Sequence, residues 1–500
     1  MKKIKSYWEE DYKKFEEIKE DKEVSICIIG GGITGISTAY YLSKSMKVIV
    51  VEKDRLFSKT SGKNTGKVTS QHGLFYDYLI NSEGEEFAKE YLEANQSAID
   101  NIENIIKQEK INCDFERENA YVFTKQKDEL EKIKQEVEAV NKLKENLCEY
   151  KQNLKLPFKI LGAIEFRNQA KINPVKYGYG LVKKIIENNG EIFETSQVTN
   201  ITKKGKKYII DVNNNKITAD YVVIATRYPN ISFPGYYFLK MYQSTSYAMV
   251  FDCKSELFDG MYISAEVPTI SFRTIKEKDK TLLLAVGYDY KTGSQDVENG
   301  YVEIEKLVKN IYSEAQVLYK WTAEDCISLD KNPYIGEFSN MMKNVYIATG
   351  FNKWGLTTSN IAAQIISDKI LGKNNKYEEI FKSTRMELIK NIEEVKNMLS
   401  QASKSIVLSK FEIPEEQLKN VKNGEGKIVN VNNTKVGIYK TEDGEIYKVK
   451  PICTHLGCEL HFNNIEKMWE CPCHGSKFNY KGESIEVPSN KNLDALQLKK

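Results

Sequence analysis

The chain has 500 residues, with 73 Lys and Arg against 70 Asp and Glu and a formal net charge of +3. This length predicts two or three domains, and the nearly even charge argues against a nucleic-acid partner. No run of about twenty apolar residues occurs and no apolar run follows the basic residues at the start, so we expect no transmembrane segment, no secretory signal and a cytoplasmic protein.

The first part of the chain has the pattern of a dinucleotide-binding fold. Residues 1–22 are predicted to form a charged N-terminal helix, and an apolar strand follows and ends at a glycine-rich turn. Gly30, Gly32 and Gly35 give this turn the form G-x-G-x-x-G, and the next strand ends at Glu52. Glycines in this pattern let backbone amides and a helix N-terminus approach a pyrophosphate, and Glu52 would accept hydrogen bonds from an adenosine ribose.

The remaining chain alternates between helical, mixed and strand-rich stretches. The expected fold is an α/β Rossmann-type domain with an antiparallel-sheet substrate domain and a small all-β C-terminal domain. The predicted parts are an N-terminal helix (1–22), a dinucleotide-binding domain (23–235) with a helical insertion (about 76–160), a β-rich substrate domain (236–330), a closing dinucleotide-binding segment (331–375), a helical linker (376–410) and the C-terminal domain (411–500).

Four of the nine cysteines and three of the four histidines lie in one short C-terminal stretch. Two thiolates and two imidazoles can hold the two irons of a Rieske-type [2Fe–2S] cluster, or alternatively one structural zinc ion. A glycine in each half favours the cluster, because two loops must fold tightly over it. The two halves read Cys453-Thr-His455-Leu-Gly-Cys458 and Cys471-Pro-Cys473-His474-Gly-Ser476.

Both halves match the Rieske family pattern in full, so the C-terminal domain resembles that family. The resemblance implies that Cys453 and Cys471 bind the buried iron and that His455 and His474 bind the exposed iron. It also implies a disulfide between Cys458 and Cys473, the pair that joins the two loops in part of the family.

A polar loop, residues 58–72, follows the second strand of the dinucleotide fold. This loop, together with later segments in the same order, resembles the superfamily of D-amino-acid oxidase, glycine oxidase and sarcosine oxidase over residues 24–372. The resemblance implies that the dinucleotide is FAD. It implies cofactor contacts at Ser61, Asn64, Thr65, Gly66, Val198, Ala225, Thr226, Gly350, Gly355, Leu356 and Thr357.

Catalytic candidates are few. Amino-acid oxidases of this superfamily carry an Arg shortly before the segment that begins here at Asp330, but residues 321–329 contain none. Arg273, His72 and Lys353 are the catalytic candidates. Each could instead be a residue without a catalytic role: Arg273 in a surface ion pair, His72 as a structural histidine and Lys353 as an exposed lysine. The helix that starts near Gly355 would direct its positive end at the flavin and stabilise the negative charge of reduced flavin.

Two functions from different classes fit the sequence. In the first, a small organic substrate (an amine, amino acid or hydroxy acid) reduces FAD, and electrons pass singly to the cluster and then to a protein or quinone. The second is an electron-transfer or redox-sensing protein without substrate turnover; a cavity over the flavin, lined by residues 236–330, would separate the two. Electron flow from the cluster to the flavin is a third option. No second glycine motif follows a strand, so we expect no NAD(P)H domain.

Overall fold

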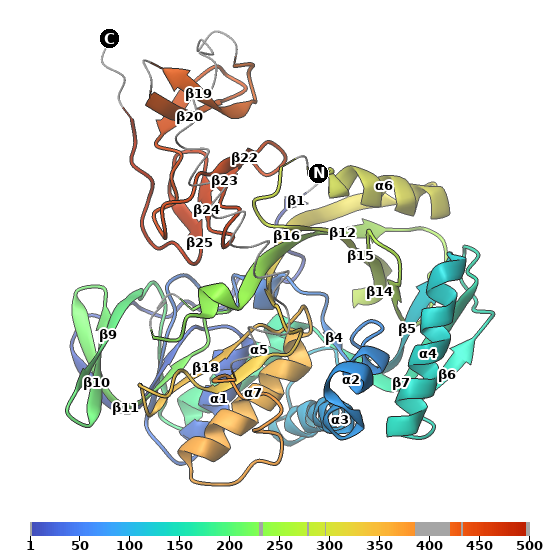
Figure 1. The fold of residues 1–500 in the computed structure, drawn as a ribbon, viewed down its shortest axis with the longest axis horizontal. Helices are drawn as coiled ribbons and strands as arrows, with labels where there is room; N and C mark the ends of the chain where they lie inside the picture. Colours follow the sequence, from blue (N-terminus) through green and yellow to red (C-terminus); the bar gives the residue numbers. More distant parts are fainter. Residues whose placement is uncertain are drawn as a thin grey trace.

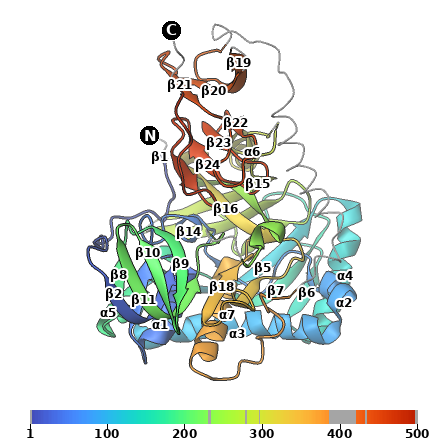
Figure 2. The ribbon, with the colours of Figure 1, turned by 60° about the vertical axis from the view of Figure 1, so that its left-hand side comes forward.

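The computed structural model describes residues 3–229, 234–277, 280–295, 297–385, 421–431 and 434–496. Two large sheets form the main body of the molecule, and the C-terminal strands stand on one end of it (Figure 1). A view turned by 60° shows the same arrangement, with the C-terminal strands next to the sheet that contains β16 (Gln316–Ser328) (Figure 2).

The first sheet carries the dinucleotide fold. The predicted βαβ unit is formed by β2 (Lys22–Ile29), α1 (Ile33–Ser43) and β3 (Val48–Val51), and its strands pair in parallel. The strand order is β17-β18-β11-β2-β3-β8, with β9 and β10 as a hairpin beside β11. The other elements are α5 (Pro174–Glu187), β8 (Glu191–Phe193), β9 (Val198–Lys204), β10 (Lys207–Val212), β11 (Asn215–Ile224), β17 (Tyr334–Glu337), β18 (Val345–Thr349) and α7 (Gly355–Ile370).

Both faces of this sheet are covered. Every residue of β3 is buried, as expected for a strand inside a parallel sheet. One face packs against α1, α5 and α7 through residues such as Ile28, Ile36 and Ile366. The other face packs beneath the β9–β10 hairpin through residues such as Ile29 and Ile210.

The second sheet is mostly antiparallel, with the order β1-β16-β12-β15-β14-β13-β5-β7-β4 and β6 beside β7. Helix α6 covers its outer face, where Ile304 and Val308 pack with Leu283. Its elements and the nearby helices are β1 (Lys3–Ile4), η1 (Thr60–Gly62), β4 (Lys67–Val68), α2 (Tyr76–Glu83), α3 (Glu85–Glu109), β5 (Glu116–Thr124), α4 (Lys127–Leu143), β6 (Cys148–Lys151), β7 (Gly162–Lys171), η2 (Tyr237–Leu239), β12 (Met241–Asp252), β13 (Met261–Ser264), β14 (Ile270–Glu277), β15 (Lys280–Lys291), α6 (Gly300–Ile311) and β16 (Gln316–Ser328).

The C-terminal part consists of two small antiparallel sheets. Trp469 and Phe478 are fully buried between them and the cysteine-bearing loops. The strands are β19 (Gly426–Val431), β20 (Thr434–Lys440), β21 (Ile446–Val449), β22 (His461–Asn463), β23 (Met468–Glu470), β24 (Lys477–Asn479) and β25 (Ser484–Glu486).

The prediction of an N-terminal helix is wrong for residues 3–22, which form β1 and then an extended segment before β2. Two amides of this segment bond to side chains between β8 and β9 instead of to carbonyl groups one helical turn away. Phe15 N donates to Glu194 (2.9 Å) and Ile18 N donates to Ser196 (3.0 Å). The aromatic side chains therefore face separate partners along the body and do not form one helical stripe.

Three smaller expectations also differ from the structure. The region predicted as a helical insertion holds three helices, but it also holds two strands that extend the second sheet: β5 lies between α3 and α4, and β6 follows α4. Val198 begins β9 and does not end the preceding strand. Of the predicted linker helix, residues 376–385 form turns and a bridge, and 386–410 lie outside the described residues. Among the helices that the structure describes, none has the length and apolar character needed to span a membrane.

Candidate functional site

The glycine turn between β2 and α1 leaves no space for side chains. Gly30 has φ +112°, and a Cβ there would lie 2.5 Å from the carbonyl oxygen of Ala225. A Cβ on Gly35 would overlap the carbonyl oxygen of Gly30. The turn therefore presents bare backbone at the start of α1, which is the geometry that a pyrophosphate requires.

Glu52 directly follows β3 and reaches back to this turn. Its carboxylate accepts hydrogen bonds from Gly31 N (2.7 Å) and from Asp54 N (2.9 Å). Burial raises the pKa of Glu52, while these two amides act in the opposite direction. The position suits an acceptor for the two hydroxyls of a ribose.

A cleft opens between the turn, the polar loop and the start of α7, and it encloses about 1490 Å³, including the part open to solvent. Gly35, Gly66 and Thr357 lie outside its lining; the Thr357 hydroxyl donates to the carbonyl of Thr69 (3.3 Å). The predicted contacts that line the cleft are Gly30, Gly32, Glu52, Ser61, Asn64, Thr65, Val198, Ala225, Thr226, Gly350, Gly355 and Leu356.

Helix α7 begins at the wall of this cleft. Its N-cap residue, Trp354, offers no side-chain hydrogen bond to the first-turn amides, and the first turn contains no acidic residue. The amides and the positive end of the helix dipole are thus available to an anionic group. This arrangement fits the pyrimidine side of a reduced flavin.

The polar loop is held by hydrogen bonds to its carbonyl oxygens. The N-terminal segment supplies two of these bonds and β16 supplies the third, so the loop is fixed from both sides. The bonds run from Ser6 Oγ to Gly62 O (2.5 Å), from Trp8 Nε1 to Asn64 O (2.7 Å) and from Trp321 Nε1 to Lys63 O (2.9 Å).

His72 is a buried structural histidine and does not line the cleft. Its Nε2 donates to the Thr69 carbonyl (2.9 Å), so its Nδ1 accepts from the Tyr91 hydroxyl (2.9 Å). The ring stacks on Trp354 at 4.7 Å. Burial lowers the pKa of His72 to about 3, so the ring stays neutral.

Arg273 is also buried outside the cleft lining. Its guanidinium donates to Gly66 O (2.8 Å) and Ile172 O (3.3 Å) and lies 5.4 Å from the Trp8 ring. Burial lowers its pKa to about 10. These contacts make Arg273 a support for the polar loop.

Lys353 lines the cleft, but its amine is paired with Asp289 at 2.7 Å. Several cleft residues were not predicted from the sequence, among them Lys67, Asp325 and Cys326. Burial, reinforced by a neighbouring guanidinium, lowers the pKa of Lys67 to about 7. Burial raises the pKa of Asp325 and raises that of Cys326 to about 12, so the cysteine remains a thiol. Only Lys67 gave a sequence signal, because it directly follows the polar motif.

The four predicted cluster ligands come together between the two C-terminal loops. The rings of His455 and His474 lie 5.1 Å apart at 88°. The pKa of Cys453 is lowered to about 7, first by the Cys471 thiol and then by amides of its own loop and the Ser476 hydroxyl. Within the described residues, His474 Nδ1 is buried without a hydrogen-bond partner. Two cysteine thiols together with two histidine rings are the donor set of a Rieske cluster.

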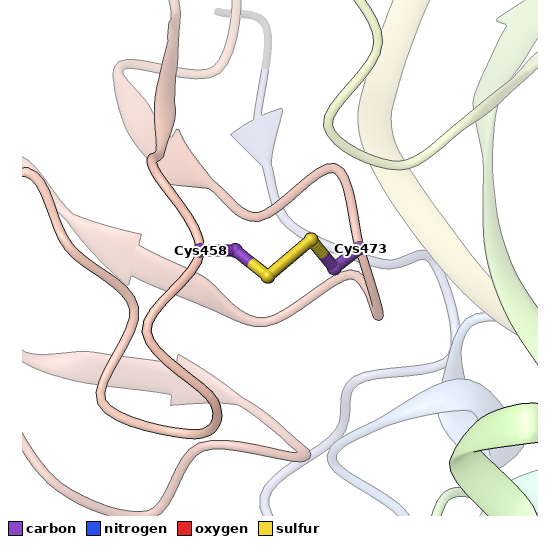
Figure 3. The surroundings of a disulfide bond; sticks show 2 residues. All are labelled: Cys458 and Cys473. Atoms are coloured by element: carbon purple, nitrogen blue, oxygen red, sulfur yellow. A yellow bond between two sulfur atoms is a disulfide. The ribbon is translucent and has the colours of Figure 1, made fainter. Parts of the chain in front are cut away.

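Cys458 and Cys473 are bonded to each other in the structure and join the two loops (Figure 3). Potential ligand atoms of Cys458, Cys471 and Cys473 lie within 4.8 Å of one another. Because the disulfide occupies two of these sulfurs, Cys471 and Cys453 are the thiols left for iron.

The C-terminal domain contributes to the cleft as well. Glu486, Val487 and Asn490 are part of its lining. Glu486 forms an ion pair with Arg227 (2.7 Å) across the two domains. Burial alone would raise the pKa of Glu486, but Arg227 and Lys59 outweigh it and hold this pKa well below its usual range.

Comparisons with known proteins agree with this geometry. Residues 25–369 match the family described as FAD dependent oxidoreductase, and residues 412–497 match the Rieske [2Fe-2S] domain. The chain is 34% identical over 499 residues to the putative Rieske 2Fe-2S iron-sulfur protein YhfW of Bacillus subtilis, covering 99% of this chain and 97% of that protein.

Two further similarities each cover about three quarters of the chain. Gamma-glutamylputrescine oxidoreductase of Escherichia coli is 23% identical over 384 residues, which are 73% of this chain and 88% of that protein. The structure of glycine oxidase from Geobacillus kaustophilus superimposes with a TM-score of 0.63 at 14% identity and covers 73% of this chain and 99% of that one.

The fold and the two sites define a flavoprotein oxidoreductase with an iron–sulfur domain. The chain belongs to the family of FAD-dependent oxidoreductases, and it carries a C-terminal Rieske [2Fe-2S] domain. Its cofactors are FAD and a Rieske [2Fe–2S] cluster, which sets aside the zinc alternative.

Proposed function

We propose that this enzyme oxidises a small organic substrate at FAD and passes the electrons singly through the Rieske cluster to an external acceptor, a protein or a quinone. One observation carries the proposal: the domain that holds the cluster ligands also forms part of the wall of the FAD cleft, through Glu486, Val487 and Asn490. The two redox sites therefore adjoin within one chain.

In this proposal, different cleft residues bind different parts of FAD. The glycine turn binds the pyrophosphate, Glu52 accepts from the ribose, and Val198 contacts the adenine through its backbone. The polar loop, Ala225, Thr226 and the Gly350 turn surround the flavin, and the amides that start α7 stabilise its negative charge after reduction. FAD supplies the hydride-accepting chemistry, and it can exchange electrons in pairs or singly.

For the substrate class we favour an amine or amino acid. The proteins similar to this chain include a gamma-glutamylputrescine oxidoreductase and a glycine oxidase. Asp325 stands on the cleft wall, in the stretch where the amino-acid oxidases carry an Arg shortly before the Asp330 segment. A carboxylate there would attract the ammonium group that amines and amino acids share.

The rival function, electron transfer or redox sensing without turnover, also has support. The range 236–330 was expected to line a substrate cavity, yet its contribution to the cleft is Asp325 and Cys326. A flavin site that admits no substrate would show the same small contribution from this range.

One experiment separates the two functions. Anaerobic holoprotein is mixed with amines, amino acids and hydroxy acids, and the flavin band and the EPR signal of the reduced cluster are followed together. Bleaching of the flavin followed by the EPR signal supports the enzyme. A flavin that responds to none of them, but exchanges electrons with reduced or oxidised carrier proteins, supports the rival function.

We expect the protein to act in a reducing cytoplasm. Five buried cysteines outside the C-terminal domain are free thiols, which is consistent with this location: Cys27, Cys113, Cys148, Cys253 and Cys326.

A further inference from the structure

The two loops that carry the cluster ligands have different surroundings. We name residues 471–476 the docked loop and residues 453–458 the open loop. The docked loop lies against the flavin domain. Gln243 on β12 donates through Nε2 to the carbonyl oxygens of His474 (2.7 Å) and Val487 (2.7 Å).

Two glycines make this contact close. A Cβ on Gly475 would lie 2.7 Å from the Gln243 side chain, so the docked loop admits no larger residue there. From the flavin domain, a Cβ on Gly293 would lie 2.5 Å from the backbone of Cys471 and Pro472. The amide of Gly293 also donates to Glu470 Oε2 (3.0 Å).

His474 is enclosed by this contact. Only 6% of the residue is exposed, and its ring meets Phe238 edge to face at 5.8 Å. Among the described residues the open loop has less cover, and His455 on it is partly exposed. Leu456 is 44% exposed, and the space around the Cα of Gly457 is empty within the described residues.

Buried charges hold the domains in this position. Lys477 of the C-terminal domain lies 3.1 Å from Glu324 of β16, and each is at most 4% exposed. Arg227 and Glu486 make a second ion pair across the same interface. Separating the domains would break several charge-assisted hydrogen bonds at once, so the docked position is the resting position.

We propose that the two cluster histidines have different roles: electrons pass between the flavin and the cluster at the enclosed His474, and between the cluster and the external acceptor at His455 on the open loop. This inference rests on the proposed function. Oxidation of one substrate molecule releases two electrons, which cross the cluster one after the other to two equivalents of a one-electron acceptor, and protons leave to solvent.

The first test needs no turnover. The oxidised holoprotein is treated with diethyl pyrocarbonate, and labelling of each histidine is followed by mass spectrometry. We expect His455 to be labelled at least about tenfold faster than His474, because labelling of an enclosed ring requires local opening. Equal rates, or faster labelling of His474, would overturn the inference. Gln243→Ala should raise the labelling of His474 severalfold, whereas Gln316→Ala, a control at an exposed glutamine of β16, should not.

The second test separates the two transfers. The flavin is photoreduced without substrate and the cluster is observed; in a separate reaction, dithionite-reduced protein is mixed with ferricyanide. Gln243→Ala should slow flavin-to-cluster transfer about tenfold or more, the effect of losing hydrogen bonds worth roughly 1.4 kcal/mol, and leave ferricyanide oxidation within about twofold. Leu456→Glu should slow ferricyanide oxidation and leave internal transfer unchanged. The reverse pattern would contradict the assignment.

The two failures can be told apart. If the wild-type cluster stays oxidised after flavin photoreduction while labelling still singles out His455, the proposed function fails and the role of His474 in internal transfer fails with it, although the enclosed geometry stands. If internal transfer is fast but both histidines are labelled equally, the inference alone fails.

Discussion

Lys477→Met tests how the two domains are held together. Lys477 is 1% exposed, and its amine lies 3.1 Å from Glu324 and 3.4 Å from Glu470. Burial alone would lower the pKa of Lys477, but the two carboxylates outweigh it and raise this pKa, so the lysine is charged. Methionine keeps the length of the side chain and removes the charge.

Removing one partner of a buried ion pair typically costs about 3–5 kcal/mol, because the other charge is left uncompensated. In this protein, separation of the two domains can avoid that cost. Glu324 belongs to the flavin domain and Lys477 to the C-terminal domain, so separation of the domains returns Glu324 to water. We therefore expect Lys477→Met to release the C-terminal domain before either domain unfolds.

Calorimetry and small-angle X-ray scattering measure this outcome. Lys477→Met should unfold in two separate transitions and have a larger radius of gyration, while Lys481→Met, at an exposed lysine of the same domain, should match the wild type. The pKa of Glu324 is lowered in the docked protein: burial opposes this, but Lys63 and Lys477 outweigh it. Its stabilising contribution is therefore complete above the ordinary Glu pKa of about 4.3 and is lost as the pH falls through the lowered value. A single transition and an unchanged radius in Lys477→Met would refute this reasoning.

Three further predictions concern other parts of the site. Trp8→Ala should weaken FAD retention on gel filtration, because it removes the bond to Asn64 O (2.7 Å) and about 3–5 kcal/mol of packing; retention equal to wild type would exclude this support role. Lys67→Met should raise the thermal midpoint more at pH 6 than at pH 9, since a pKa lowered to about 7 destabilises the fold most below that pH; equal gains would contradict it. Ser476→Ala should lower the cluster potential in voltammetry by roughly 40–50 mV, the equivalent of about 1 kcal/mol of hydrogen bonding to Cys453; an unchanged potential would show that the hydroxyl does not tune the cluster.

The sequence was most informative where chemistry requires residues at short spacing. The glycine turn and the cluster loops each lie within a few residues of chain, so their spacing indicates a dinucleotide site and a metal or cluster site. The N-terminal segment was misjudged for the opposite reason. Tyr12 stacks on Tyr179 at 3.8 Å and Trp8 bonds to Asn64, and partners so distant in sequence leave no local periodicity.

The same limit applies to the cleft. Asp325 and Cys326 reach it from β16, a strand of the second sheet, and only the packing of the two sheets brings them to the cofactor. Arg273 and His72 were reasonable catalytic candidates by residue type. Both are buried, and each donates a hydrogen bond to a backbone carbonyl of the polar loop; such burial cannot be deduced from a single sequence.

The charges at the domain interface pose a question of energetics. Buried ion pairs often stabilise a protein no more than apolar residues of the same size would, so strength alone does not explain Lys477–Glu324 and Arg227–Glu486. Their effect on the placement of the C-terminal domain explains these ion pairs better. Each pair joins one domain to the other. A shift of the C-terminal domain would leave Glu324 with only the more distant Lys63 and Arg227, and it would separate Glu486 from Arg227. An apolar interface tolerates sliding, whereas this one fixes a single placement of His474 against the flavin domain. That fixed placement is what transfer of electrons between two sites in one chain requires.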